Sequence, residues 1–385
     1  MDSEQYSDSG VSKDSARICI FSQRNVERTV VRCVDYEFED VICEVDDAEV
    51  FGPTPYPTSQ IAQKLSNRLL RHFSYTGFNP GFKKFQISRD YELFMAICMF
   101  PYDLRRIDTL KEWRERSKIA VCWIAEIWAG KLHKWKPYLK ILSKFDYIVT
   151  NCSATVQPLQ DMIQRPCFYI PPGIDTTRFS PYPNPPVRCI DVYSLGRRSP
   201  VTHQSLLEMV EEKQIFYIYD TIVRMKTLNC KQHRNLIANI AKRSRYFFAN
   251  SAMIDNTSRT QEQTEIGYRF LEGAASGTIM IGEHPQNEAF REHFDWQDAV
   301  IHVPFGTANI AEILEDLDSQ PERLEKARKN NIIQSLLRHD HAYRWRAILD
   351  IVGLEPRPAL IKRENRLKEL AEMAETHQEP QICNP

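Results

Sequence analysis

The most informative stretch of this 385-residue sequence is TEIGYRFLEGAASGTIMIG, at residues 264–282. Its apolar spacing predicts a helix that begins near Gly267 and ends at Gly277, where glycine can take up a positive φ. The strand TIMIG follows directly. A helix next to a nearly continuous apolar strand is typical of a parallel sheet that helices cover on both faces.

The same alternation of apolar strands and amphipathic helices runs along the chain on both sides of this stretch. Strands are predicted at 17–21, 92–100, 118–125, 146–150, 166–170, 188–196, 214–219, 245–250, 277–282 and 298–303. Amphipathic helices are predicted between them, for example at 59–73 and 130–145. The predicted fold class is therefore α/β.

A proline-rich stretch at 171–187 divides this alternation into two series. Six prolines fall within it, and because proline lacks an amide hydrogen and fixes φ, a regular element is not expected there. We interpret the stretch as a hinge between domains, although a long surface loop within one domain would have the same composition. The predicted division is a flexible tail at 1–15, a Rossmann-like domain at 16–170, the hinge at 171–187, a second Rossmann-like domain at 188–352, and a C-terminal helix and tail at 353–385.

Ligands of such sheets bind at the carboxyl ends of the strands. We therefore expect two domains that face each other across a cleft, with the C-terminal helix crossing back.

Composition and charge exclude several classes of protein. The 50 Lys and Arg residues nearly balance 51 Asp and Glu, a formal net charge of −1, so no nucleic-acid partner is expected. Any anionic ligand must then be bound by a local group of cations. The ten cysteines include no Cys-x-x-Cys pair, and no apolar run approaches the ~20 residues of a membrane span. We expect a reduced, cytoplasmic protein.

Three charged residues of the opening stretch have helical spacing. Glu265, Arg269 and Glu272 lie at i, i+4 and i+7, and would share one face of the predicted helix. A carboxylate there can accept hydrogen bonds from a ribose diol, and the helix N-terminus favours an anion such as a diphosphate. A flank of salt-bridged side chains has the same spacing, so both interpretations stay open.

The segment resembles the signature of GT-B-fold glycosyltransferases of group 1, in which Glu-Ala-x-Ala-x-Gly ends a helix before a strand. The matching residues are EGAASG at 272–277. The resemblance implies that Glu272 binds the ribose of a nucleotide sugar. The family's first glutamate corresponds to Thr264, and the nearest acid, Glu265, is the candidate for a catalytic contact with the transferred sugar.

A second matching segment is DVYSLGRRSPVTHQSLL, at 191–207. The family has a strand that ends in Gly-Arg and a lysine a few residues later, and both cations bind the diphosphate. Gly196 and Arg197 fit, which makes Arg197 a catalytic candidate. No lysine follows, and Arg198 or His203 is the candidate to replace it.

The phrase IPPGIDTTRFSP at 170–181 resembles the family's hinge. The resemblance makes 16–170 the acceptor domain and 188–352 the nucleotide-sugar domain. Tyr268, Arg269 and Asn250 are further candidates to contact the donor.

Glu126 follows the strand at 118–125 and stands where many family members have a His-Asp pair. It is a candidate for the catalytic base, for a contact with the acceptor, or for an acid that caps a helix.

The resemblance implies a glycosyltransferase that moves a sugar from a nucleotide-diphosphate sugar to an acceptor hydroxyl, with retention of configuration. No cofactor and no metal site are predicted. The acceptor, whether a glycan, a lipid or a small molecule, is not specified by the sequence. A nucleotide-sugar 2-epimerase on the same fold, and a non-catalytic, degenerate transferase that acts as a binding module, remain alternatives.

The segment 131–145 contains five lysines, no acid and several apolar residues. Such a basic amphipathic helix is typical of a peripheral contact with an anionic membrane, or of the solvated face of a Rossmann helix.

Overall fold

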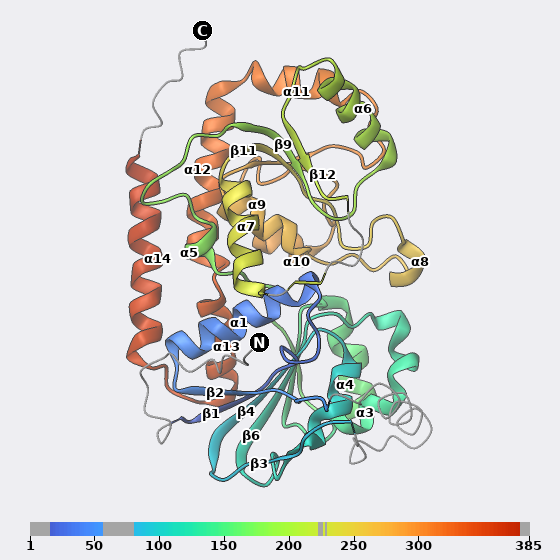
Figure 1. Ribbon diagram of the computed structural model, residues 1–385, viewed down its shortest axis with the longest axis vertical. Helices are drawn as coiled ribbons and strands as arrows, with labels where there is room; N and C mark the ends of the chain where they lie inside the picture. Colours follow the sequence, from blue (N-terminus) through green and yellow to red (C-terminus); the bar gives the residue numbers. More distant parts are fainter. Residues whose placement is uncertain (1–15, 57–80, 222–225, 228, 378–385) are drawn as a thin grey trace. The chain divides into compact units, whose positions relative to one another are not determined.

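The computed structural model describes residues 16–56, 81–221, 226–227 and 229–377 (Figure 1). Two compact units divide the chain. The first comprises Met1–Ile170, Lys226–Cys230 and Trp345–Ile361, and the second comprises Pro171–Met225, Lys231–Arg344 and Lys362–Pro385. The predicted tail at 1–15 and the predicted helix at 59–73 lie outside the described residues.

Within its described part, the first unit contains a six-stranded parallel sheet in the order β2-β1-β4-β6-β7-β8. The strands are β1 (Ile18–Phe21), β2 (Ala48–Phe51), β4 (Tyr91–Cys98), β6 (Ser117–Ile124), β7 (Tyr147–Thr150) and β8 (Cys167–Tyr169). The strand order reverses between β1 and β4, as in doubly wound sheets. The long central strands β4 and β6 are buried over nearly their whole length, because helices cover both faces.

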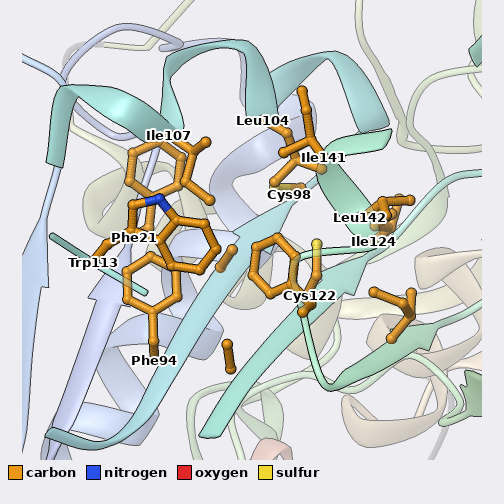
Figure 2. Packing of buried hydrophobic residues seen from close by; sticks show 14 of the residues in the cluster. Phe21, Phe94, Cys98, Leu104, Ile107, Trp113, Cys122, Ile124, Ile141 and Leu142 are labelled. Atoms are coloured by element: carbon orange, nitrogen blue, oxygen red, sulfur yellow. The ribbon is translucent and has the colours of Figure 1, made fainter. Parts of the chain in front are cut away.

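Helical segments of the first unit connect these strands. They are η2 (Val30–Arg32), α1 (Cys33–Val45), η3 (Pro101–Thr109), η4 (Ala129–Trp135), α3 (Lys136–Leu142), η5 (Ser153–Thr155) and α4 (Val156–Ile163). A small parallel pair, β3 (Phe85–Gln86) and β5 (Leu110–Lys111), lies apart from the main sheet. The core in Figure 2 joins Phe94 of β4 to Trp113, with ring centroids 4.6 Å apart, and includes Leu104 and Ile107 of η3. Cys98 and Cys122 are buried in the same core.

The second unit has a five-stranded parallel sheet among its described residues, in the order β10-β9-β11-β12-β13. The strands are β9 (Ile190–Ser194), β10 (Tyr217–Tyr219), β11 (Ser244–Phe248), β12 (Ile279–Gly282) and β13 (Ile301–His302). Its helices are α5 (Thr176–Phe179), α6 (Pro200–Glu211), α7 (Cys230–Lys242), α8 (Thr257–Thr260), α9 (Tyr268–Ala275), α10 (Glu288–His293), α11 (Ile310–Asp318) and α12 (Pro321–Arg338). The first residue of α7 belongs to the first unit.

Two C-terminal helices, α13 (His341–Val352) and α14 (Pro358–Thr376), each continue from one unit into the other. Arg363 of α14 donates to Asp340 from Nε, at 2.9 Å, and to Asp175 from Nη2, at 2.7 Å. All three side chains belong to the second unit and are largely buried. This ion cluster fixes α14 to the segment that precedes α5.

The predicted strands are confirmed, although β10 and β13 are shorter than expected. The proline-rich stretch at 171–187 is not irregular throughout, because α5 forms within it. The Asp175 carboxylate caps α5 by accepting a hydrogen bond from the Arg178 amide, at 3.3 Å. The segment 131–145 is not one helix: η4 gives way to α3 at Lys136, and Pro137 lies in the first turn of α3.

Candidate functional site

A pocket in the second unit, here named the strand-end pocket, lies where β9, β11 and β12 end. Its empty volume is about 290 Å³, part of which is open solvent. The lining residues are Ser194, Arg198, Ser199, Thr202, His203, Leu206, Tyr217, Phe248, Asn250, Gly282, Val303, Pro304 and Phe305. Three of the predicted donor-binding residues, Arg198, His203 and Asn250, are therefore brought together.

The turn after β9 positions Arg198 through an acid that the sequence analysis did not single out. The Asp220 carboxylate accepts hydrogen bonds from the Gly196 amide, at 3.0 Å, and from Arg198 Nη1, at 2.6 Å. The Arg198 guanidinium also lies over the Tyr219 ring, 5.4 Å from its centroid. Asp220 directly follows β10, so its place at a strand end was the signal that could have revealed it.

His203 of α6 lies in an aromatic environment on the same side of the pocket. Its Nδ1 is 3.0 Å from the Tyr217 hydroxyl, and its ring centroid is 4.8 Å from that of Tyr219. Burial lowers the pKa of His203, and the nearby Arg198 lowers it further. The imidazole is thus neutral near pH 7. Of the two candidates to replace the missing lysine, Arg198 is therefore the one that carries a positive charge.

Asn250 and Gly282 form another wall of the pocket. The Asn250 Oδ1 accepts a hydrogen bond from the Glu283 amide, at 2.9 Å, which joins the segments that follow β11 and β12. Gly282 has a φ of +148°, and a Cβ at this position would lie 2.2 Å from the Ala249 carbonyl oxygen. Only glycine fits this wall.

A second group of predicted residues forms the Glu272 cluster, defined here as Glu272 and Arg269 of α9 together with Arg234 of α7. The Glu272 carboxylate accepts hydrogen bonds from both guanidinium groups. Its side chain is 1% exposed and that of Arg234 is 4% exposed, whereas Arg269 is partly accessible. Burial raises the pKa of Glu272, but Arg269 and Arg234 more than offset this effect and hold the pKa below its ordinary value.

Tyr193 of β9 lies close enough to Asp220 beside the strand-end pocket and to the Glu272 cluster for their charges to act on its hydroxyl. Its buried hydroxyl has no hydrogen-bond partner. Burial raises the pKa of this hydroxyl; Arg269, Glu272, Asp220 and Arg234 also act on it. Neither Tyr193 nor Arg234 was found from the sequence, because no motif marks a tyrosine within a strand or an arginine in the middle of a helix.

The predicted helix from Gly267 to Gly277 is confirmed, with Gly267 as N-cap of α9 and Gly277 at a φ of +66°. The expectation that Glu265 shares a helical face with Arg269 and Glu272 is wrong, because α9 begins only at Tyr268. Glu265 is instead buried before the helix, and its carboxylate accepts a hydrogen bond from Gln263 Nε2, at 2.6 Å. Tyr268 packs, partly buried, against the core of the second unit.

The two remaining catalytic candidates lie elsewhere. Arg197 does not line the strand-end pocket; it is exposed and pairs with Asp255 at 2.5 Å. Glu126 belongs to the first unit and follows β6, where its amide donates to the Met99 carbonyl oxygen at 2.8 Å. Its carboxylate accepts a hydrogen bond from Trp128 Nε1, at 2.9 Å.

One comparison with known proteins concerns a part of the chain that lies mainly in the second unit. Residues 224–350 match the family model described as glycosyl transferase-like. The match includes Asn250 and the Glu272 cluster, but it does not include the turn of Gly196 and Arg198. No curated protein sequence matches the chain at a significant level.

Solved structures share the architecture of the whole chain. Anabaena HepE in complex with UDP-glucose is 12% identical with a TM-score of 0.50, over 87% of this chain and 99% of that one. A UDP-forming α,α-trehalose-phosphate synthase from Burkholderia xenovorans is 10% identical with a TM-score of 0.51, over 88% and 99%. The N-terminal domain of Candida albicans trehalose-6-phosphate phosphatase is 8% identical with a TM-score of 0.50, over 87% and 96%.

At such identities the solved structures establish the fold alone, and the family match covers residues 224–350 only. This chain therefore has the GT-B fold of two Rossmann-like domains, and its residues 224–350 are similar to the glycosyl transferase-like family.

Proposed function

We propose that this chain transfers a sugar from a nucleotide-diphosphate sugar to an acceptor hydroxyl, with the donor bound by the second unit. One observation carries the proposal: a polar pocket and a paired-arginine cluster occur together where the strands of a doubly wound sheet end. HepE, which has the same fold, was solved with UDP-glucose.

The donor is expected to be held by positively charged groups at its diphosphate and by a carboxylate at its ribose. Arg198 and the N-terminus of α9, with Arg269 in its first turn, offer positive charge to the diphosphate. A carboxylate has about four acceptor positions, and the two guanidinium groups use two of those on Glu272. The ribose contact that the resemblance implies also requires this carboxylate, whose side chain is 1% exposed, to become accessible when the donor binds.

The reaction places its largest charge change on the leaving diphosphate. Arginine groups that are already held in place need little rearrangement to stabilise this charge, which is typically worth about 3 kcal/mol per donor. Arg198 is held by Asp220, and Arg269 by Glu272. We propose on this basis that the transfer needs no metal ion, and that it proceeds with retention, as the group 1 resemblance implies. Glu126 remains a proposal for the base or for an acceptor contact.

The donor-site proposal is tested with Arg198→Met and the control Arg245→Met. Arg245 lies near the amino end of β11, at the opposite end of the strands from the strand-end pocket, and is an arginine paired with acids, Asp191 and Asp318. Both pairs are partly exposed, and each variant is expected to cost about 1 kcal/mol of stability or less. Arg198→Met is expected to weaken nucleoside-diphosphate binding at least about tenfold in calorimetry.

The same titrations are repeated with a panel of nucleoside diphosphates and nucleotide sugars, with and without a chelator. If none of these ligands binds or raises the unfolding temperature, the donor proposal fails. Release of nucleotide only when an acceptor is present supports transfer. Interconversion of the donor without acceptor would instead identify the epimerase alternative, and binding with no turnover would identify a binding module.

We also propose that the η4–α3 surface of the first unit contacts an anionic membrane. Lys134, Lys136 and Lys140 are exposed on it, and Trp135 is partly buried beside them. None of the described helices combines the length and the apolar composition needed to cross a bilayer. Each exposed cation near an anionic surface contributes about 1 kcal/mol at low salt.

Reversal of these three lysines to glutamate is expected to abolish co-sedimentation with phosphatidylserine vesicles at low salt. Reversal of the exposed Lys362 and Lys368 on α14 is the control and is expected to change nothing. If the wild type binds pure phosphatidylcholine vesicles as well as it binds phosphatidylserine vesicles, the electrostatic contact is contradicted.

A further inference from the structure

Two cysteines that are distant in the sequence lie together in the first unit. Cys33 is the first residue of α1, and Cys230 is the first residue of α7. The segments that precede them are paired, because Thr29 and Lys226 form an antiparallel bridge. The Cys33 and Cys230 thiols lie within hydrogen-bonding reach of each other.

The surroundings of Cys230 favour its thiolate. The hydrogen bond with Cys33 lowers the pKa of Cys230, and Arg24 acts in the same direction, whereas burial, Asp40 and Glu39 oppose it. Cys230 is also the first residue of α7, and the N-terminus of a helix stabilises negative charge. Cys230 is partly exposed and Cys33 is only 1% exposed, so a small oxidant meets Cys230 first.

We propose that Cys33 and Cys230 are a site of reversible oxidation, at which a hydroperoxide forms a disulfide. The Cys230 thiolate attacks one peroxide oxygen: an S–O bond forms, the O–O bond breaks, and the leaving oxygen departs as water or an alcohol after protonation. The Cys33 sulfur then attacks the Cys230 sulfur: the S–S bond forms, the S–O bond breaks, and water leaves. Two electrons pass from the two thiols to the peroxide.

The chain supplies two internal controls for this site. Cys98 and Cys122 also hydrogen-bond to each other, but both are fully buried, and burial raises the pKa of Cys98. They are a thiol pair that an oxidant in solution cannot reach. Cys189 is exposed and so has access to an oxidant. Only the pair of Cys33 and Cys230 combines access, a neighbouring thiol and a stabilised thiolate among the described residues.

The reduced full-length chain is treated with a small excess of hydrogen peroxide, and the remaining thiols are blocked with iodoacetamide before non-reducing peptide mapping. A peptide pair linked through Cys33 and Cys230 is expected to accumulate several-fold faster than Cys189 is lost. Cys98 and Cys122 stay reduced, and dithiothreitol reverses the linkage.

In Cys33→Ser the reaction is expected to stop at a Cys230 sulfenic acid, which dimedone traps. The proposal is overturned if Cys189 is oxidised as fast as Cys230 in the wild type, or if Cys230 links mainly to another cysteine. The wild-type measurement decides this even if the variant does not fold. The site does not depend on the proposed transfer reaction.

Discussion

Gly282 connects the backbone of β12 to the shape of the strand-end pocket. A Cβ added there would overlap the Ala249 carbonyl oxygen and come within 2.8 Å of Asn250 Oδ1. Gly306 directly follows Phe305, which lines the same pocket, yet a Cβ added to Gly306 meets nothing within 4 Å. The two glycines differ both in what surrounds them and in backbone conformation, since only Gly282 of the two has a positive φ, +148°.

We expect Gly282→Ala to destabilise the chain by about 3 kcal/mol or more, because the backbone must shift to relieve the overlap. Gly306→Ala is expected to stay within about 0.5 kcal/mol of the wild type. Urea unfolding followed by circular dichroism measures both. Equal stabilities of the two variants would show that the backbone around Gly282 can accommodate a Cβ.

At the scale of elements, α14 carries a buried arginine that forms ion pairs within the second unit. Arg363 is 6% exposed and donates to Asp340, which is fully buried and also accepts a hydrogen bond from the Thr176 amide at 2.9 Å. Three residues further along the same helix, Arg366 forms an exposed pair with Glu369 at 2.9 Å. A comparison of the two arginines thus tests how burial changes the contribution of an ion pair to stability on a single helix.

Arg363→Met should cost about 3–5 kcal/mol, because it leaves the Asp340 carboxylate buried without a counter-charge. Arg366→Met should cost less than about 0.5 kcal/mol, since exposed pairs contribute little. Chemical denaturation at low and at high salt measures both effects. A small loss for Arg363→Met would mean that water or another group compensates Asp340.

The elements also show how far sequence reasoning reached. Strands such as β4 and β6 were predictable because each contains a long, nearly continuous apolar run. Helix α1 and strand β2 were not predicted, since CVDYEFEDVICEV mixes apolar residues with acids that the structure buries, among them Glu39. The helix at Glu272 was predictable from its glycine boundaries, but the partner of Glu272 was not, because Arg234 lies on another helix and only tertiary packing joins them.

At the scale of the whole molecule, buried histidines make stability depend on pH. Burial lowers the pKa of His293 to about 4, and Arg344 and Arg338 contribute. Burial also lowers the pKa of His339 well below its ordinary value, and its Nε2 lies 3.0 Å from the His293 carbonyl oxygen. Below about pH 6.5 the unfolded chain binds protons at these positions that the folded chain does not bind.

The free energy of unfolding should therefore be highest above about pH 6.5 and fall as the pH drops toward 4. After allowance for partial exposure, His293 alone contributes roughly 1 kcal/mol of this loss between pH 7 and pH 5. His293→Gln is expected to flatten the dependence, and His133→Gln, at an exposed position, is the control. A steeper loss in His293→Gln than in the wild type would contradict the assignment.

The division of the chain into units has a consequence for biosynthesis. The first unit needs Trp345–Ile361 as well as the first 170 residues. Trp345 is completely buried, and its indole donates to Asp46 at 2.9 Å, while Arg17 donates to the Glu355 carbonyl oxygen at 2.8 Å. When the ribosome has synthesised the chain only as far as Ile170, Trp345 and Glu355 do not yet exist. The N-terminal half can therefore complete its interior only after nearly the whole polypeptide has been synthesised. A fragment that stops at Ile170 would lack part of its own interior.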